Sequence, residues 1–172
     1  FINQFDTTEA TYNIPAALRL TGALDVDALR LAVTDVIERH EVLRTVFPSA
    51  SGQPHQLVCD ASEFDERGVW RIVGSEQELY DTLVTGFDVT IEWPLRARLF
   101  SVSDTEFVFA VVAHHIGADG ESMLPLVTDI VTAYSIRAQG DTPQWAPLPV
   151  QFADYAIWQH QALGSADDAD SV

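Results

Sequence analysis

The sequence predicts an α/β fold of layered α+β type, and two patterns carry this prediction. Residues Phe107 to Ala113 form a continuous apolar run, which is typical of a buried strand and is too short for a membrane helix. Apolar side chains recur at helical spacing from Val26 to Ile37, which predicts a helix with one buried stripe. With 172 residues and 47% hydrophobic composition, the chain is expected to build one sizeable core and one domain at most.

The amino-terminal part is expected to hold one helix between strands. A first strand is expected over Ala16 to Thr21, and Gly22 turns the chain toward a helix that Asp25 caps. Further strands are expected at Leu43 to Phe47 and Gln56 to Val58, with turn-forming residues between them. These two strands are expected to pair as a hairpin.

The middle of the chain is expected to carry a short helix followed by two strands. Ser75 and Glu78 form a capping-box pattern ahead of a helix that runs to about Thr85. Residues Leu95 to Val102 and Glu106 to Ala113 are expected to be antiparallel strands joined by a short turn.

Two more helices are expected toward the carboxyl end. The first begins after Gly120 and ends at Gly140, and the second covers about Val150 to Leu163. Tyr155 and Trp158 are expected to be packing anchors of the second helix, because aromatic side chains most often fill cores.

Charge and composition exclude several function classes. Nine arginines, no lysine and 26 acidic residues give a net charge of −17, and the arginines are dispersed along the chain. A nucleic-acid binder needs clustered cations, so nucleic acid is not an expected partner. One cysteine excludes an internal disulfide framework, and no segment reaches the length of a membrane span, so no membrane association is expected. The chain shows no charged-then-apolar leader, which favours a cytoplasmic protein.

The most informative motif follows the buried apolar run. Residues His114 to Gly120 read H-H-I-G-A-D-G, which places two imidazoles, a carboxylate and a glycine at a strand exit. A neutral imidazole there could take a proton from an amine or hydroxyl near physiological pH. Gly120 would let a substrate carbonyl approach the backbone, and its N–H could face a developing oxyanion. Asp119 could orient an imidazole or pair with an arginine.

Plainer interpretations of this motif stay open. Adjacent histidines on a strand point to opposite sides, so at most one is expected to do chemistry and the other to be buried and hydrogen-bonded. A metal site ranks below acid–base chemistry, because the other histidines are far apart in sequence and Cys59 has no partner cysteine. On the motif alone, a structural loop and a catalytic loop are about equally expected.

A second motif lies upstream. Residues Arg39 to Phe47 read R-H-E-V-L-R-T-V-F, and together with the histidine motif they closely resemble the condensation domains of nonribosomal peptide synthetases. Those domains are similar in fold to chloramphenicol acetyltransferase. Further matches follow the family's order over nearly the whole chain: Ala10 to Gly22, Phe87 with Asp88, Pro94 to Arg96, and Gln151 to Trp158.

The resemblance implies a chloramphenicol acetyltransferase-like lobe with a mixed sheet flanked by helices. It also implies that residues 1–172 are a partial condensation domain, the amino-terminal lobe, without the first family motif and the carboxy-terminal lobe. The family places its reaction in a tunnel between two lobes, so the chain alone is expected to be inactive. Phe152 stands where the family usually has a tyrosine, so no hydroxyl is expected there. The tail at 164–172 is expected to be mobile.

The family's reaction joins a carrier-bound donor thioester to a carrier-bound acceptor amine and forms an amide. The resemblance implies that His115 either deprotonates the attacking amine or holds it by a hydrogen bond, and the sequence leaves this choice open. His114 carries over as a structural neighbour. Gly120 carries over as space for the substrate and as a possible N–H donor.

The resemblance also implies a salt bridge that holds the histidine loop. Asp119 is its acidic member, and Arg44 is the expected partner because a strand arginine among apolar neighbours is costly to bury unpaired. Arg39 is the other candidate. Neither a metal nor a directly bound cofactor is expected. Phosphopantetheine arrives on the donor and acceptor peptidyl carrier proteins, which are expected partners together with an adenylation domain and the carboxy-terminal lobe.

Alternative functions stay open. A free-standing acyltransferase that uses coenzyme A thioesters would share the histidine motif, and a docking or scaffold lobe would need no chemistry. Heterocyclising relatives carry an aspartate-based motif that this chain lacks. Epimerising relatives typically continue differently after the aspartate, so Gly120 to Met123 favours condensation. The stereochemistry of the amino acids that are joined is left open.

Overall fold

A four-stranded mixed sheet forms the centre of the molecule. The computed structural model describes residues 9–50 and 52–163, so the tail predicted to be mobile lies outside the described residues. The strand order is β1-β8-β7-β6, in which β1 and β7 run antiparallel to β8, and β6 runs parallel to β7. The bounds are Asn13–Thr21 for β1, Trp70–Val73 for β6, Leu95–Ser103 for β7 and Glu106–His114 for β8.

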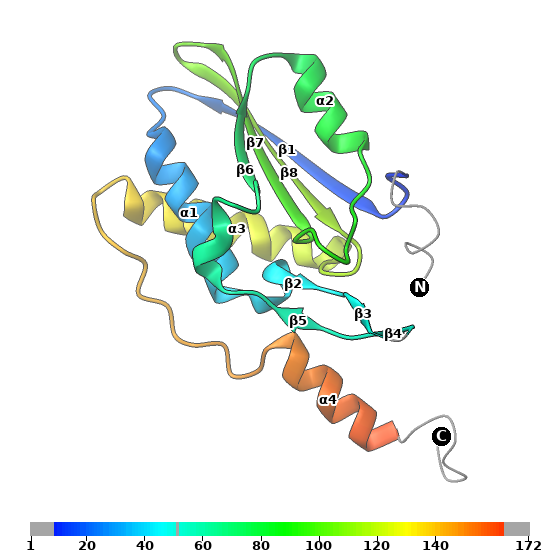
Figure 1. Ribbon diagram of the computed structural model, residues 1–172. Coiled ribbons are helices and arrows are strands. Elements are labelled where there is room, and N and C mark those ends of the chain that lie inside the picture. The colour runs from blue at the N-terminus through cyan, green and yellow to red at the C-terminus, as the bar shows by residue number, and fades with distance from the viewer. Residues whose placement is uncertain (1–8, 51, 164–172) are drawn as a thin grey trace.

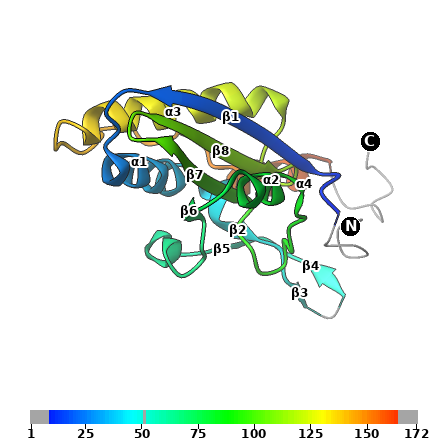
Figure 2. The ribbon, with the colours of Figure 1, turned by 90° about the horizontal axis from the view of Figure 1, so that it is seen from above.

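Helices cover both faces of this sheet. On one face, α1 (Val26–Arg39) and α3 (Gly120–Arg137) pack together and enclose the largest apolar core (Figure 1). The other face carries α2 (Glu76–Val84) (Figure 2). Leu79 of α2 packs with a smaller cluster of strand residues. The prediction of a mixed sheet flanked by helices is therefore confirmed.

Alternation along the strands decides which side chains reach which face. In β7, Leu95, Ala97 and Leu99 belong to the core beneath α1 and α3. Arg96 and Arg98 point to the opposite face, on the side of α2. The same alternation in β8 brings His114 to the α2 side, where Val112 packs with Phe87.

The local start signals of the helices are confirmed. Asp25 is the N-cap of α1, and its carboxylate accepts a hydrogen bond of 2.9 Å from the backbone N–H of Ala28. Ser75 caps α2 by accepting from the N–H of Glu78 at 3.2 Å. The return bond of the predicted capping box reaches one residue further, because the Glu78 carboxylate accepts from the N–H of Gly74.

The segment at 43–47 differs from the prediction. Residues Glu41–Arg44 form a short 3-10 helix, η2, and only Thr45–Val46 form a strand, β2. The hairpin is confirmed, since β2 pairs antiparallel with β5 (Leu57–Val58), and two further short strands, β3 (Ser49–Ala50) and β4 (Gln53–Pro54), extend it. A second 3-10 helix, η3 (Ala61–Phe64), and strand β6 were not predicted, because their short sequences show no clear periodicity.

The last helix, α4 (Phe152–Leu163), stands apart from the sheet (Figure 1). None of its described residues is buried, and Tyr155 and Trp158 are 44% and 60% exposed. The prediction that they anchor packing is therefore wrong for this chain, where the two rings contact each other at 5.7 Å between centroids. None of the described helices combines the length and the apolar character that a membrane crossing requires.

Candidate active site

The histidine motif forms a tight loop between β8 and α3. A turn closes where the N–H of Gly117 donates to the carbonyl of His114 at 2.9 Å. Two more backbone bonds fix the start of the loop, from His114 to the Pro94 carbonyl at 3.0 Å and from His115 to the Tyr12 carbonyl at 2.8 Å. The loop is thus tied to the residues that flank both neighbouring strands.

The two histidines have opposite environments. His114 is 4% exposed, and its Nδ1 accepts a hydrogen bond of 3.0 Å from the N–H of Ile116, so the neutral ring carries its proton on Nε2. Burial, with the nearby charges of His115 and Arg96, lowers the pKa of His114 to about 4. His115 is exposed. The prediction that one histidine is buried and hydrogen-bonded is confirmed for His114.

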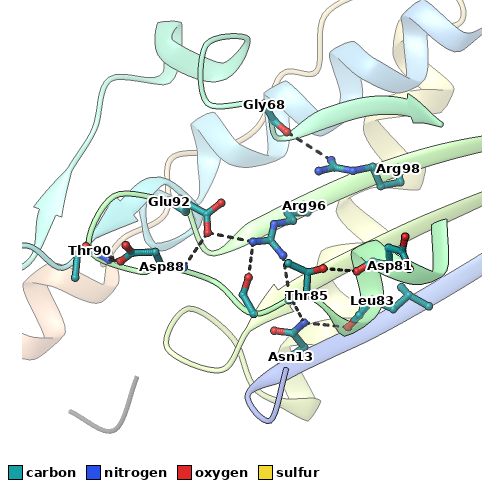
Figure 3. A network of polar contacts seen from close by, with 11 residues as sticks. Asn13, Gly68, Asp81, Leu83, Thr85, Asp88, Thr90, Glu92, Arg96 and Arg98 are labelled. Atoms are coloured by element: carbon teal, nitrogen blue, oxygen red, sulfur yellow. Dashed lines mark hydrogen bonds and ion pairs between the residues drawn. The ribbon is translucent and has the colours of Figure 1, made fainter. Parts of the chain in front are cut away.

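An aromatic ring and an arginine support the buried histidine. The Phe87 ring meets the His114 ring edge-on, with centroids 5.8 Å apart, and the Arg96 guanidinium lies 3.7 Å from the Phe87 centroid. Arg96 also donates to the carbonyls of Thr85 and Gly86, at 2.8 and 2.7 Å (Figure 3). These contacts hold the segment after α2 against the histidine. Phe87 and Arg96 both belong to the segments that resemble the family, but no role was predicted for them from the sequence.

Asp119 is a helix cap. Its Oδ1 accepts a hydrogen bond of 2.9 Å from the N–H of Ser122, and the Ser122 hydroxyl donates to the same oxygen. These bonds, with the hydroxyl bond as the largest cause, lower the pKa of the Asp119 carboxyl. The carboxylate therefore fixes the first turn of α3, and the signal for this role was a serine three residues further along the chain.

The predicted salt bridge to Asp119 is wrong for both arginine candidates. Arg44 donates to the Cys59 carbonyl and lies 3.4 Å from the Glu41 carboxylate, because η2 turns its side chain toward the hairpin. Arg39 lies 3.4 Å from Asp129 in α3 and stacks over the Trp145 ring at 4.7 Å. Within the described residues, Asp119 forms no ion pair, and its Oδ1 accepts both hydrogen bonds from Ser122.

A different contact joins the upstream motif to α3. His40 Nε2 lies 2.8 Å from the Asp129 carboxylate, which Arg39 also approaches. Both residues sit at the carboxyl end of α1, so this contact joins α1 to the helix that follows the histidine loop. Arg39, the other candidate, therefore pairs with Asp129, while Arg44, the expected partner of Asp119, lies near Glu41.

Two glycines of the loop have different surroundings. A Cβ at Gly117 would lie 2.9 Å from Cγ of Pro94, whereas a Cβ at Gly120 would meet no atom within 4 Å. Close packing therefore requires glycine at 117, a position for which no role was predicted from the sequence. Gly120 borders open space at the amino end of α3, as a residue beside an approaching substrate would.

A cavity of about 470 Å³ lies beside the loop, lined by Gly117, Ala118, Asp119 and Ser122 on one side and by His40 and Val42 on another. It brings the two sequence motifs together. In the described part of the chain, no group of three or more histidine, cysteine, aspartate or glutamate side chains is arranged to hold a metal ion.

The chain matches a known family and known proteins along nearly its whole length. The sequence model described as the Condensation domain matches residues 1–171. An isonitrile lipopeptide synthase of Mycobacterium tuberculosis is 45% identical over 177 residues, and a dimodular nonribosomal peptide synthase of Bacillus subtilis is 43% identical over 177 residues. These matches cover 99% and 100% of this chain and 7% of each relative, so the chain spans a small part of them.

Solved structures agree with this assignment. The X-domain from teicoplanin biosynthesis is similar with a TM-score of 0.82 and 38% identity, over 97% of this chain and 37% of that one. The starter condensation domain of rhizomide synthetase RzmA has the same fold, with a TM-score of 0.76 at 16% identity, over 96% of this chain and 41% of that one. The chain belongs to the Condensation domain family of nonribosomal peptide synthetases.

Proposed function

We propose that this chain is the amino-terminal part of a condensation domain that forms peptide bonds between substrates held on two carrier proteins. The acceptor amine attacks the thioester carbonyl of the donor, the new C–N bond forms, and the C–S bond breaks. The donor thiol leaves with the proton that the amine loses. The observation that carries this proposal is the division of labour between a buried, hydrogen-bonded His114 and an exposed His115 at the strand exit.

His115 is the residue proposed to contact the attacking amine. Its backbone N–H is bonded to the Tyr12 carbonyl, while its side chain is exposed. A substrate can therefore contact the imidazole without any rearrangement of the core. An imidazole there can take the amine proton or hold the amine in position. Gly120 and the first N–H groups of α3 lie at the positive end of a helix, which favours a developing oxyanion.

The proposed partners follow from this reaction. Phosphopantetheine would belong to the donor and acceptor carrier proteins as part of the substrates, and an adenylation domain would load the carriers. The rest of the condensation domain is proposed to cover the exposed apolar side chains at α4. Three large apolar side chains of α4 are exposed to water: Phe152 by 48%, Ile157 by 60% and Trp158 by 60%. Apolar side chains that gather on a surface in this way are typical of a contact with another part of a protein.

Transfer of a peptide between two loaded carrier proteins tests this function, with intact-mass detection of the product. The chain would be compared with the chain extended through the rest of its domain and with the extended His115→Ala variant. Extended His55→Ala is a matched control, because His55 is exposed on the distant hairpin. We expect transfer by the extended protein and by His55→Ala, and loss of transfer in His115→Ala.

A docking role is the second candidate. One solved relative at 38% identity is described as a complex of the X-domain and OxyB from teicoplanin biosynthesis, so a relative of this chain binds another protein. Absence of transfer by the extended protein, with both carriers verified as loaded, would favour this role. Transfer from a coenzyme A thioester without carriers would instead favour a free-standing acyltransferase.

A further inference from the structure

Within residues 9–50 and 52–163, two arginines lack the acidic partner that the other arginines have. Seven of the nine arginines form an ion pair with an aspartate or glutamate. The other two are Arg71 and Arg98, and neither has an ion pair within the described residues. Since the chain has 26 acidic residues, a pair of unmatched cations is unexpected.

These two arginines are neighbours. Arg71 in β6 and Arg98 in β7 are direct partners in the parallel register, so both side chains lie on the α2 side of the sheet. Both approach Gly68. Nη1 of Arg98 is 3.5 Å from the Gly68 carbonyl oxygen (Figure 3). Nη2 of Arg71 is 3.1 Å from where a Cβ at this position would stand. Like charges opposite each other in a sheet repel, which destabilises the pair.

Arg98 is also buried. It is 6% exposed, and its hydrogen bonds among the described residues all come from Nη1, to the carbonyls of Gly68, Val69 and Ala97. Burial, followed by the charge of Arg71, lowers the pKa of Arg98 to about 10, so the side chain stays cationic at neutral pH. Three carbonyl dipoles satisfy one nitrogen, but they supply no counter-charge.

A cavity of about 500 Å³ opens in front of this pair, and Arg67 and Arg96 also line it. The cavity therefore gathers four of the nine arginines of a strongly acidic chain. Arg67 and Arg96 are bound to the carboxylates of Glu63 and Glu92, so among the described parts of the chain Arg71 and Arg98 are the lining cations without an acid.

The acids on the wall of the cavity are engaged elsewhere. Glu78 accepts from the N–H of Gly74 at 2.8 Å, and Asp81 accepts from the Gln77 side chain at 2.8 Å. Glu92 binds Arg96 at 3.1 Å. None of these carboxylates lies within ion-pair distance of Arg71 or Arg98 in the described structure.

We propose that this cavity binds a phosphate group between Arg71 and Arg98. A phosphate dianion would balance two cations at once, and the flat guanidinium groups match its oxygens with paired N–H donors. The opening of the cavity would admit either free inorganic phosphate or the phosphate of a small ester. This binding is separate from the proposed peptide transfer, because the group would lie beyond Arg96 on the side away from the histidine loop.

Calorimetric titration with inorganic phosphate tests the proposal, using the chain extended through the rest of its domain, at constant ionic strength set with sodium chloride. The decisive variant is Arg71→Gln, since Arg71 is exposed and its loss removes no ion pair. Arg19→Gln is the matched control, because Arg19 is an exposed arginine on β1, paired with Glu106. We expect wild type and Arg19→Gln to bind equally and Arg71→Gln to bind about tenfold more weakly.

Arg98→Gln is expected to abolish phosphate binding, with circular dichroism to check that it folds. If Arg98→Gln does not fold, Arg71→Gln decides alone. The proposal would be overturned if wild type and Arg71→Gln bound phosphate with equal affinity. It would also be overturned if wild type bound no phosphate at a phosphate concentration about tenfold above a millimolar dissociation constant. Titration with glycerol 3-phosphate distinguishes free phosphate from a phosphate ester. Tighter binding of glycerol 3-phosphate than of inorganic phosphate would identify a phosphate ester as the ligand. Peptide transfer is not part of this readout, so each proposal can fail without the other.

Discussion

Replacing Gly117 by alanine should destabilise the protein although the change adds one methyl group. The new Cβ would lie 2.9 Å from Cγ and 3.3 Å from Cβ of Pro94, and 3.4 Å from the carbonyl oxygen of Val42. Favourable contacts between carbon atoms begin at about 3.5 Å, so the loop or the proline must move. Pro94 is a rigid ring, fully buried, and its carbonyl accepts the N–H of His114. Overpacking of this kind costs about 1–3 kcal/mol.

Urea denaturation of the wild type, Gly117→Ala and Gly120→Ala would measure this cost. Gly120 is the matched control from the same loop, because a Cβ there meets no atom within 4 Å and lies in the first turn of α3, where alanine is tolerated. We expect Gly120→Ala to keep or exceed the wild-type free energy of unfolding, because alanine favours a helix more than glycine does. An unfolding free energy of Gly117→Ala within about 0.3 kcal/mol of wild type would refute the packing argument. In transfer assays of the extended protein, Gly120→Ala should lose activity without losing stability if this residue borders the substrate.

Three further predictions concern titration, capping and the exposed helix. The pKa of His114 falls from 6.5 to about 4 on folding, so between these pH values the unfolded chain binds a proton that the folded protein does not. The contribution of His114 to the free energy of unfolding should therefore be complete above pH 6.5 and should fall by ~3 kcal/mol as the pH falls to about 4. His114→Asn keeps an acceptor for the N–H of Ile116, so a pH dependence as steep as that of the wild type would contradict this assignment. Asp119→Ala should lower the melting temperature more than Asp119→Asn, because the amide oxygen still caps α3; equal losses would argue against the cap. Trp158→Ala should leave the melting temperature of the 172-residue chain unchanged and lower that of the extended protein, and no change in either would argue against a covered α4.

Much of the local structure could be predicted, because its signals lie within a few residues. Asp25 and Ser75 cap their helices through hydrogen bonds that span three residues. The strand at 106–114 contains a continuous apolar run, and a short turn joins it to the strand at 95–103. The position of the histidine motif at a strand exit follows from the same local pattern. The period of a strand also predicts that one histidine of the pair is buried.

The identity of charged pairs could not be predicted, because each depends on chain segments that are far apart in sequence. Asp119 had two arginine candidates, yet a serine three residues away satisfies it, and Arg39 instead meets Asp129. The segment at 41–44 reads as strand, but it winds into η2 and turns Arg44 toward the hairpin. A side chain on a strand and one on a short helix reach different partners.

The sequence by itself determined the family, the order of most helices and strands, and the loop that carries the histidines, since these rest on motifs and periodicity within short windows. The tertiary structure decided which histidine is buried, why Gly117 must stay small and where α4 exposes its aromatic side chains. It also brought Arg71 and Arg98 together from strands that pair in parallel. Burial and the neighbours of a charge are properties of the packed sheet and helices, and no short window of sequence contains them.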